Sequence, residues 1–285
     1  MFNRLIRYIR KYGFIHTCTT VAIYSFNFLN NKKNDFLSKF SVEFLIHKRR
    51  IRLSKSLSRQ MNNTVGYGPF SGLILTDYIW NRVNVGNRLL GLYEKEVLQS
   101  LYKVPASHKT LVDMGAADGY FAIGCLIANM FNKVYCFESS PDAQKKLFDN
   151  ASLNHVQDRI EIFGLATKKF PFELQGKGVD ISKCVVLCDI EGGEFEVFDE
   201  NTLKALKGAV IIIEIHDWHK NGIGGYSRLR ERVGKYFNIT TLTTGSRDLS
   251  PFTEVAKLSD NDRWLLCSEG RNYLTTWLRL DPKSY

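Results

Sequence analysis

The pattern of hydrophobic and polar residues changes character near Lys109. Beyond that residue, short apolar runs alternate with stretches in which apolar residues recur every three or four positions. Near-continuous apolar runs are typical of strands that are buried on both faces of a parallel sheet, and the longer period is typical of helices. The alternation therefore predicts an α/β fold with a mostly parallel sheet and helices on both faces. The expected strands are TLVDMG, KVYCFE, RIEIFG, CVVLCD, AVIIIEIH, NITTLTT and RWLLCS, and the expected helices are Tyr120–Met130, Pro141–Leu153 and Arg228–Tyr236.

The chain before this region has a different organisation. Up to Gln60 the pattern predicts helices with basic faces, and NNTVGYGPFSG then predicts an irregular connector because it is rich in Asn and Gly. NRLLGLYEKEVLQSLY, residues 87–102, has the apolar spacing of one amphipathic helix. We therefore expect a basic, mainly helical N-terminal extension with its connector over residues 1–86 and the main domain over residues 87–285.

Positive charge is concentrated in the N-terminal extension. The first 60 residues contain 13 Lys and Arg against Asp35 and Glu43, a net +11, whereas the remainder has 26 basic and 27 acidic side chains. This asymmetry suggests contact with an anionic surface, such as membrane headgroups, acidic glycan or nucleic acid, or else a solvated helical arm. The first thirty residues are too polar for a spanning helix and lack a signal-peptide cleavage site. A helix on the membrane surface and a helix packed on the domain both remain open.

The cysteines favour a reducing compartment. Cys136, Cys184 and Cys188 lie in predicted buried strands, where a reduced cysteine behaves as a small apolar residue. The spacing of Cys184 and Cys188 is not that of a zinc-binding pair. We therefore expect a cytoplasmic protein, with peripheral membrane contact through the basic N-terminus as an option.

VDMGAADGY, residues 112–120, lies where the first predicted strand turns into the first helix. Ligands of open α/β sheets bind next to such turns, at the carboxyl ends of the strands. Gly115 and Gly119 allow a sharp bend and a close approach of the backbone to a ligand. The helix that follows presents free N–H groups and a partial positive charge, which suit a carboxylate. Asp113 is expected to hold the loop amides or an ammonium group of the ligand.

Glu138 ends the second predicted strand, 23 residues after Gly115. An acid at this position holds the ribose hydroxyls in Rossmann-type sites. A dinucleotide site would have glycine where this chain has Ala117 and Tyr120, so NAD is disfavoured and a cofactor without phosphates is favoured.

Together with FESSPDAQKKLFDNASLN, CDIEGGEFEVF and VIIIEIHDW, this loop resembles the FkbM-type family of class I S-adenosylmethionine-dependent methyltransferases. The resemblance covers residues 87–218. It implies a Rossmann-like fold with a mostly parallel seven-stranded sheet, S-adenosylmethionine as the cofactor, and O-methylation of a sugar, glycan or related small molecule. The chain has Asp118 where Asn is frequent in the family, which would place a negative charge close to the cofactor. The residues expected to contact the cofactor are Asp113, Gly115, Ala116, Asp118, Gly119, Tyr120, Glu138, Ser139 and Asp189.

The acceptor of the methyl group is expected at the ends of the fourth and fifth strands. Asp189 is the favoured residue for positioning or deprotonating the acceptor, and His216 is the competing base. Glu191 and Glu194 are expected to shape the loop or to bind acceptor hydroxyls, although Glu194 also suits the N-terminus of a helix. A divalent cation held by Asp189, Glu191 and His216 is an option that the spacing does not require, and no metal is assigned.

Two other classes of function remain. One is an RNA methyltransferase that uses the basic N-terminal arm, although the sequence contains no recognisable RNA-binding module. The other is a non-catalytic module that keeps the cofactor fold for binding, and the acidic residues on the acceptor side argue against it.

Overall fold

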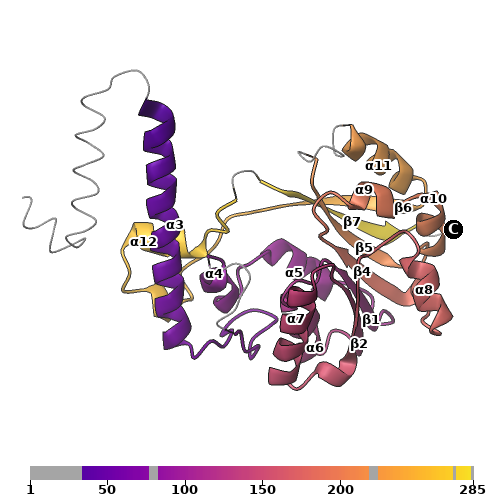
Figure 1. The fold of residues 1–285 in the computed structure, drawn as a ribbon, viewed down its shortest axis with the longest axis horizontal. Coiled ribbons are helices and arrows are strands. Elements are labelled where there is room, and N and C mark those ends of the chain that lie inside the picture. The colour runs from indigo at the N-terminus through magenta and orange to yellow at the C-terminus, as the bar shows by residue number, and fades with distance from the viewer. Residues whose placement is uncertain (1–33, 77–82, 218–223, 272–273, 284–285) are drawn as a thin grey trace, which may run out of the picture. The chain divides into compact units, whose positions relative to one another are not determined.

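The computed structural model of the chain describes residues 34–76, 83–217, 224–271 and 274–283, with side chains from Val42 onward (Figure 1). Predictions for the first 33 residues, including Cys18, lie outside the described residues. The elements, in chain order, are α3 (Asn34–Gln60), α4 (Val85–Leu89), α5 (Lys95–Tyr102), β1 (Thr110–Met114), α6 (Tyr120–Ile127), β2 (Lys133–Phe137), α7 (Pro141–Leu153), η1 (Gln157–Arg159), β3 (Ile160–Phe163), α8 (Phe170–Gly176), η2 (Ile181–Lys183), β4 (Cys184–Cys188), α9 (Glu194–Val197), α10 (Glu200–Ala205), β5 (Val210–Ile215), α11 (Gly225–Gly234), β6 (Phe237–Thr243), η4 (Thr253–Val255), α12 (Asp260–Cys267) and β7 (Thr276–Pro282).

The described residues form one seven-stranded sheet with the order β3-β2-β1-β4-β5-β7-β6. Strands β1 to β5 pair in parallel, and β7 runs antiparallel to both β5 and β6. The strand order reverses between β1 and β4, because β2 and β3 lie on one side of β1 and the later strands on the other. This is the Rossmann-like class I methyltransferase fold that the sequence predicts, and the reversal is where such sheets bind ligands.

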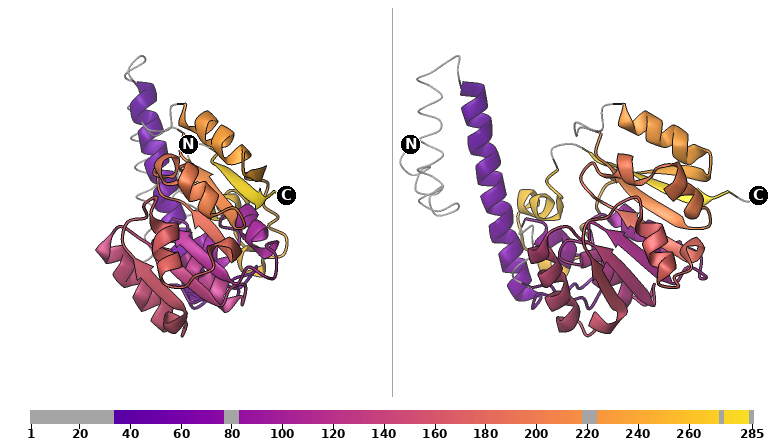
Figure 2. Two further views of the ribbon diagram at one scale, coloured as in Figure 1. Left: turned by 90° about the vertical axis from the view of Figure 1, so that its right-hand side faces the viewer. Right: turned by 45° about the vertical axis from the view of Figure 1, so that its right-hand side comes forward.

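Helices cover both faces of the sheet. Figure 1 shows α5, α6 and α7 on one face and α8, α10 and α11 on the other, and the two views in Figure 2 agree. Val112, Val186 and Ile211 face the second group and form one core with Phe170 of α8 and Leu229 of α11. The central strands β4 and β5 are buried along their whole length, as expected for strands covered on both sides.

The prediction of a strand at RWLLCS is wrong. Those residues belong to helix α12, whose first turn is capped by Ser259, which accepts a hydrogen bond from the amide of Asp262. A short apolar run alone cannot distinguish a strand from a buried helical turn, and here the Ser-Asp-Asn-Asp start decides for the helix. The closing strand is β7, formed by TWLRLDP, which the sequence analysis missed.

The single helix predicted over residues 87–102 is also wrong. The chain forms α4 and α5 there, separated by Gly91 and Glu94, which both have left-handed backbone conformations. A Cβ on Gly91 would lie 2.3 Å from the carbonyl oxygen of Tyr67, so the connector packs directly on this break. The irregular connector itself is confirmed, because it contains no helix or strand, only the isolated bridge between Thr64 and Ile74.

The chain divides into two compact units, Met1–Leu53 and Ser54–Tyr285. Helix α3 crosses the division and confirms the predicted helix in the basic extension. The predicted domain boundary between residues 86 and 87 stays a prediction. Among the described residues, no helix is long and apolar enough to cross a membrane. Cys125, Cys136, Cys184, Cys188 and Cys267 are buried free thiols.

Candidate cofactor and acceptor site

The glycine loop after β1 is pressed against the end of β4. Gly115 has a φ of 84°, and a Cβ built on it would lie 1.8 Å from the carbonyl oxygen of Asp189. The amide of Gly115 donates to the oxygen of Phe137 at 2.8 Å, and the amide of Asp189 donates to the oxygen of Met114 at 2.9 Å. Position 115 therefore admits only glycine, and the loop joins the ends of β1, β2 and β4.

The loop turns into α6 through two left-handed residues, Ala117 and Gly119. Gly119 has a φ of 87°, and a Cβ on it would lie 2.8 Å from Cδ1 of Ile123 and 3.1 Å from Leu147, so glycine is favoured at the start of the helix. Helix α6 therefore begins directly at the end of the loop. The first N–H groups of the helix have no hydrogen-bond partner within it. Ala116 is buried within the same turn.

Glu138 at the end of β2 fixes the other side of the loop. One of its carboxylate oxygens accepts from the amide of Ala117 at 2.9 Å, and the other accepts from the amide of Ser140 at 2.8 Å. Each oxygen has a second lone pair, and the side chain is only half-buried, so ribose hydroxyls can still donate to it. Ser139, the next residue, is exposed.

Asp113 lies beneath α6. It is buried, the N–H of Ala122 donates to it, and one of its oxygens accepts no hydrogen bond from the described residues. Burial raises the pKa of this carboxyl to about 7, against the opposing effect of the Ala122 N–H. Asp113 therefore supports the first turn of α6, and its contact with the cofactor stays a prediction.

Asp118 does not place an isolated charge near the cofactor. Its carboxylate forms a buried ion pair with Arg88 of α4, with 2.8 Å between Nη1 and Oδ2. The guanidinium carbon of Arg88 lies 4.8 Å from the ring centre of Tyr93 and 4.7 Å from that of Tyr120. The neighbouring Asp118 carboxylate raises the pKa of Arg88 in spite of burial, which opposes the charge. Arg88 thus neutralises the negative charge that the sequence analysis expected beside the cofactor. Tyr120 packs against the guanidinium of Arg88, and its contact with the cofactor stays a prediction.

His216 follows β5 and is almost completely buried. Glu194 at the start of α9 holds it: one carboxylate oxygen accepts from the amide of His216 at 2.8 Å and lies 3.2 Å from Nδ1. The other oxygen accepts from the amide of Gly192 at 2.9 Å. Because Glu194 is fully buried and both of its oxygens accept backbone hydrogen bonds, it positions His216 and the turn at Gly192. The contacts with Glu194 raise the pKa of His216 although burial lowers it.

Three carboxylates approach the Nε2 atom of His216. It lies 3.4 Å from Oδ1 of Asp189, 3.6 Å from Oε2 of Glu191 and 3.7 Å from Oε2 of Glu214. Glu214 is 3% exposed, Asp189 36% and Glu191 82%, so the group opens from a buried floor to the surface. Burial, followed by the charges of Glu214 and Glu94, raises the pKa of Asp189 well above its usual range. The structure therefore brings together the residues predicted for the acceptor.

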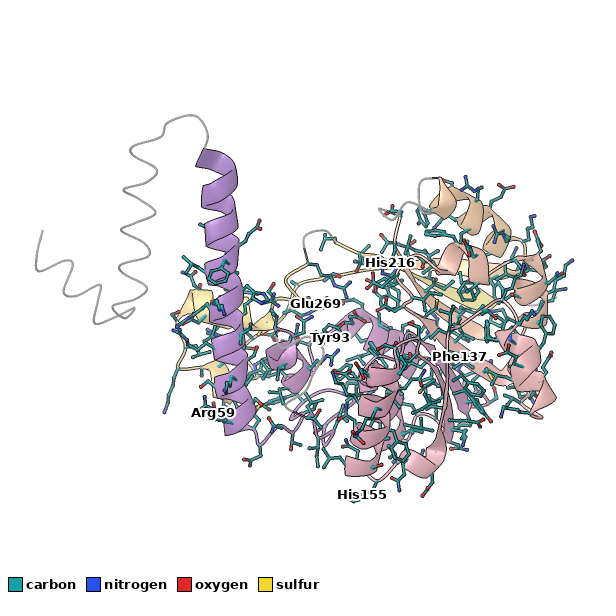
Figure 3. The ribbon with its side chains drawn as sticks, in the orientation of Figure 1. Arg59, Tyr93, Phe137, His155, His216 and Glu269 are labelled. Carbon is teal, nitrogen blue, oxygen red and sulfur yellow. The ribbon has the colours of Figure 1, made fainter. Side chains whose placement is uncertain are left out.

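Arg271 completes the floor of the site, and the sequence analysis missed it. Its guanidinium forms ion pairs with Glu94 and Glu214, and its Nε lies 2.9 Å from an oxygen of Glu269. Burial raises the pKa of Glu94 to about 8, and Glu214 adds to this while Arg271 opposes it. In Figure 3, Tyr93, Glu269 and His216 mark the three chain segments that meet here. Glu94 and Arg271 come from segments far apart in sequence, so no local motif indicates their meeting.

One family model matches part of the main domain. Residues 93–217, less than half of the chain, match the family model of the TRM5/TYW2 methyltransferase domain. No curated protein matches the chain in sequence. The FkbM-type resemblance stays a prediction.

Solved structures share the fold at low identity. An O-methyltransferase from Bacillus cereus in complex with SAH is 11% identical, with a TM-score of 0.45 over 81% of this chain and 90% of that chain. A putative O-methyltransferase from Klebsiella pneumoniae is 14% identical, with a TM-score of 0.44 over 74% and 93%. A tRNA methyltransferase from B. subtilis is 7% identical, with a TM-score of 0.41 over 65% and 64%. Nothing about the acceptor follows from these likenesses.

The cofactor is S-adenosylmethionine. The matched domain is a methyltransferase domain, and the residues of the site fit this cofactor. Gly115 and Gly119 let the loop backbone come close to a ligand without a Cβ, and Glu138 keeps acceptor capacity for ribose hydroxyls.

Proposed function

We propose that this protein transfers the methyl group of S-adenosylmethionine to a hydroxyl of a sugar, glycan or related small molecule. The observation that carries the proposal is the group formed by Asp189 and His216 beside the glycine loop. The amide of Asp189 is bonded to the residue that precedes Gly115, so its carboxylate stands next to the cofactor loop. Its side chain is partly open to solvent, and an acceptor can reach it.

S-Adenosylmethionine supplies an electrophilic methyl group when it is bound at this loop. In a transfer to a hydroxyl, the acceptor oxygen would gain the methyl group as the C–S bond breaks, and the hydroxyl proton would pass to a base. Asp189 is suited to take this proton because burial and the neighbouring carboxylates raise its pKa. His216 is the competing base, and Glu194 fixes its ring from the Nδ1 side. Glu138 and the glycine loop position the donor, so much of the rate would come from orientation.

The charge of the acceptor side favours a neutral or cationic acceptor over a polyanion. The exposed carboxylate of Glu191 lies at the mouth of the opening beside Asp189, whereas Arg271 is already engaged by Glu94 and Glu214. A phosphate backbone entering this opening would meet like charge. A sugar hydroxyl can instead donate to the exposed carboxylate of Glu191.

An RNA acceptor is the second candidate, because the matching family model is that of the TRM5/TYW2 domain and residues 1–60 have a net charge of +11. The basic segment could hold the RNA backbone outside the acidic opening. A non-catalytic binding role would leave the Asp189 and His216 arrangement without a use.

The test follows labelled methyl from S-adenosylmethionine into a cell extract that is separated into RNA, glycan and small-molecule fractions. We expect label in the glycan or small-molecule fraction. The variant Asp189→Asn should still bind the cofactor in calorimetry and should transfer the methyl group at least about 100-fold more slowly. Label in RNA alone would favour the second candidate, and cofactor binding without transfer to any fraction would favour the binding module.

A further inference from the structure

We infer that Asp189, Glu214 and His216 form a binding site for one divalent cation, and this inference rests on the proposed function only for the cation's role in the reaction. One atom from each residue, a carboxylate oxygen or an imidazole nitrogen, lies within 4.8 Å of the other two. Two oxygens and one imidazole nitrogen form a ligand set suited to Mn²⁺, Fe²⁺ or Zn²⁺.

The distances fit a ligand shell better than a set of direct hydrogen bonds. Nε2 of His216 lies 3.4 Å from Oδ1 of Asp189 and 3.7 Å from Oε2 of Glu214. Such gaps are long for hydrogen bonds. In an octahedral shell with bonds of about 2.1 Å, neighbouring ligands are separated by about 3 Å and opposite ligands by about 4.2 Å, so both His216–carboxylate distances fall within this range.

The imidazole is oriented as in metal sites. Histidine ligands usually donate their second ring N–H to a carboxylate, which fixes the tautomer and the ring direction. Glu194 occupies this position against Nδ1 of His216 at 3.2 Å, and it is itself held by the amides of His216 and Gly192. The nitrogen turned toward the carboxylates is thus Nε2.

One oxygen of the proposed ligand Asp189 and one oxygen of the neighbouring Glu94 are buried without a hydrogen-bond donor in the part of the chain that the structure describes. Oδ1 of Asp189 and Oε2 of Glu94 are shut off from solvent and accept no hydrogen bond from the described residues. Glu94 is 4% exposed and shares the guanidinium of Arg271 with Glu214, which brings these two carboxylates together. A buried carboxylate oxygen without a donor is costly, and a bound cation would satisfy it.

Arg271 and the cation would divide the oxygens of Glu214 between them. Arg271 binds Oε1, whereas Oε2 is the oxygen nearest to His216. Asp189 would bind the cation through Oδ1 and keep Oδ2 for the acceptor. A hydroxyl on the cation would lose its proton more easily, and Asp189 rather than His216 would accept it because Nε2 is engaged.

The direct test is Mn²⁺ binding to the full-length chain after treatment with a chelator, followed by electron paramagnetic resonance and calorimetry without any acceptor. We expect one site per chain. Glu214→Gln and His216→Ala should each weaken Mn²⁺ binding by at least about 100-fold, and Glu194→Gln by about 10–100-fold. Glu196→Gln is the matched control, because Glu196 lies exposed on the same helix as Glu194 and contributes nothing to the cluster.

Circular dichroism and cofactor affinity report whether each variant is folded. The inference is overturned if the wild-type chain binds no Mn²⁺ stoichiometrically, or if Glu214→Gln and Glu194→Gln, folded by these measures, bind it as the wild type does. Methyl transfer that continues at the same rate in EDTA would remove the cation from the reaction and leave the proposed function standing. Stoichiometric Mn²⁺ binding by a wild-type chain that binds no S-adenosylmethionine would support the cation site and contradict the proposed function.

Discussion

At the scale of single residues, Gly115 carries the tightest steric constraint in the cofactor loop. Gly115→Ala would combine a left-handed backbone with a Cβ only 1.8 Å from the carbonyl oxygen of Asp189. We expect a loss of about 3 kcal/mol or more in the free energy of unfolding, together with loss of cofactor binding. Urea denaturation and calorimetry measure the two effects.

Gly176→Ala is the matched control for this change. Gly176 ends α8, and a Cβ there meets no atom within 4 Å. Its stability should stay the same or rise by up to about 1 kcal/mol. Equal behaviour of the two variants would show that the loop relaxes freely and does not depend on the close approach to β4.

The buried Asp113 predicts a pH-dependent stability. Its pKa is about 7 in the folded chain against 3.8 ordinarily, so between these values the folded state keeps a proton that the unfolded state releases. The free energy of unfolding should therefore fall as the pH rises through this window, by up to about 1.4 kcal/mol per unit. Asp113→Asn removes this contribution, and the variant should gain stability relative to the wild type between pH 5 and pH 7.5.

Urea denaturation at both pH values, with Asp158→Asn as the exposed control, measures this difference. A gap between Asp113→Asn and the wild type that does not change with pH would mean that Asp113 is ionised in the folded chain throughout.

Predictability at the residue scale depends on distance along the chain. The tight turn at Gly115 and Gly119, with Glu138 beside it, could be predicted because strand, turn, helix and acid follow one another along a short stretch of chain. The contacts of Arg88 with Asp118, and of Arg271 with Glu94, join segments that only the tertiary fold brings together. Neither arginine lies in a motif, so the sequence offered no signal for them.

At the scale of elements, the break between α4 and α5 depends on Gly91. Gly91→Ala would place a Cβ 2.3 Å from the oxygen of Tyr67, whereas Gly72→Ala would meet nothing within 4 Å, although both glycines have a positive φ. Backbone strain alone should cost about 1–2 kcal/mol in Gly72→Ala, and Gly91→Ala should cost clearly more. Thermal unfolding of both variants compares them, and similar losses would mean that the connector can move away from the break.

The errors at this scale have physical causes. The apolar spacing of residues 87–102 suits a single helix, and the break arises from packing against the connector, which the periodicity does not record. The four apolar or aromatic residues of RWLLC suited a strand, but Leu266 packs closely on Gly86 of α4, where only a glycine leaves room for it. Tertiary packing, and not local propensity, decided both cases.

At the scale of the whole molecule, the alternation of apolar runs and helical periods was enough to predict the sheet and its class. The buried strands β1, β2, β4 and β5 have few alternatives, because only a sheet covered on both faces hides such runs. The position of β7 between β5 and β6 could not be inferred, because it depends on a chain reversal after α12 that carries no hydrophobic signal of its own.

The division of the chain leads to a last prediction about the basic segment. Ser54 belongs to the main unit, since its hydroxyl donates to the oxygen of Val83 and accepts from the amide of Gly86. A variant that begins at Ser54 keeps these contacts, and it retains 28 basic and 27 acidic side chains. We expect it to bind S-adenosylmethionine within about threefold of the full chain, because the glycine loop and Glu138 lie wholly in this unit.

The same truncation should abolish salt-sensitive binding to a polyanion. The removed residues carry eleven basic and two acidic side chains, and release of counterions from such a segment weakens binding steeply as salt increases. Retention on immobilised heparin in a salt gradient, measured for both chains beside calorimetry with the cofactor, separates the two properties. A truncated chain that folds but no longer binds the cofactor would place residues 1–53 in the cofactor site, and equal retention of both chains would locate the polyanion surface in the main unit.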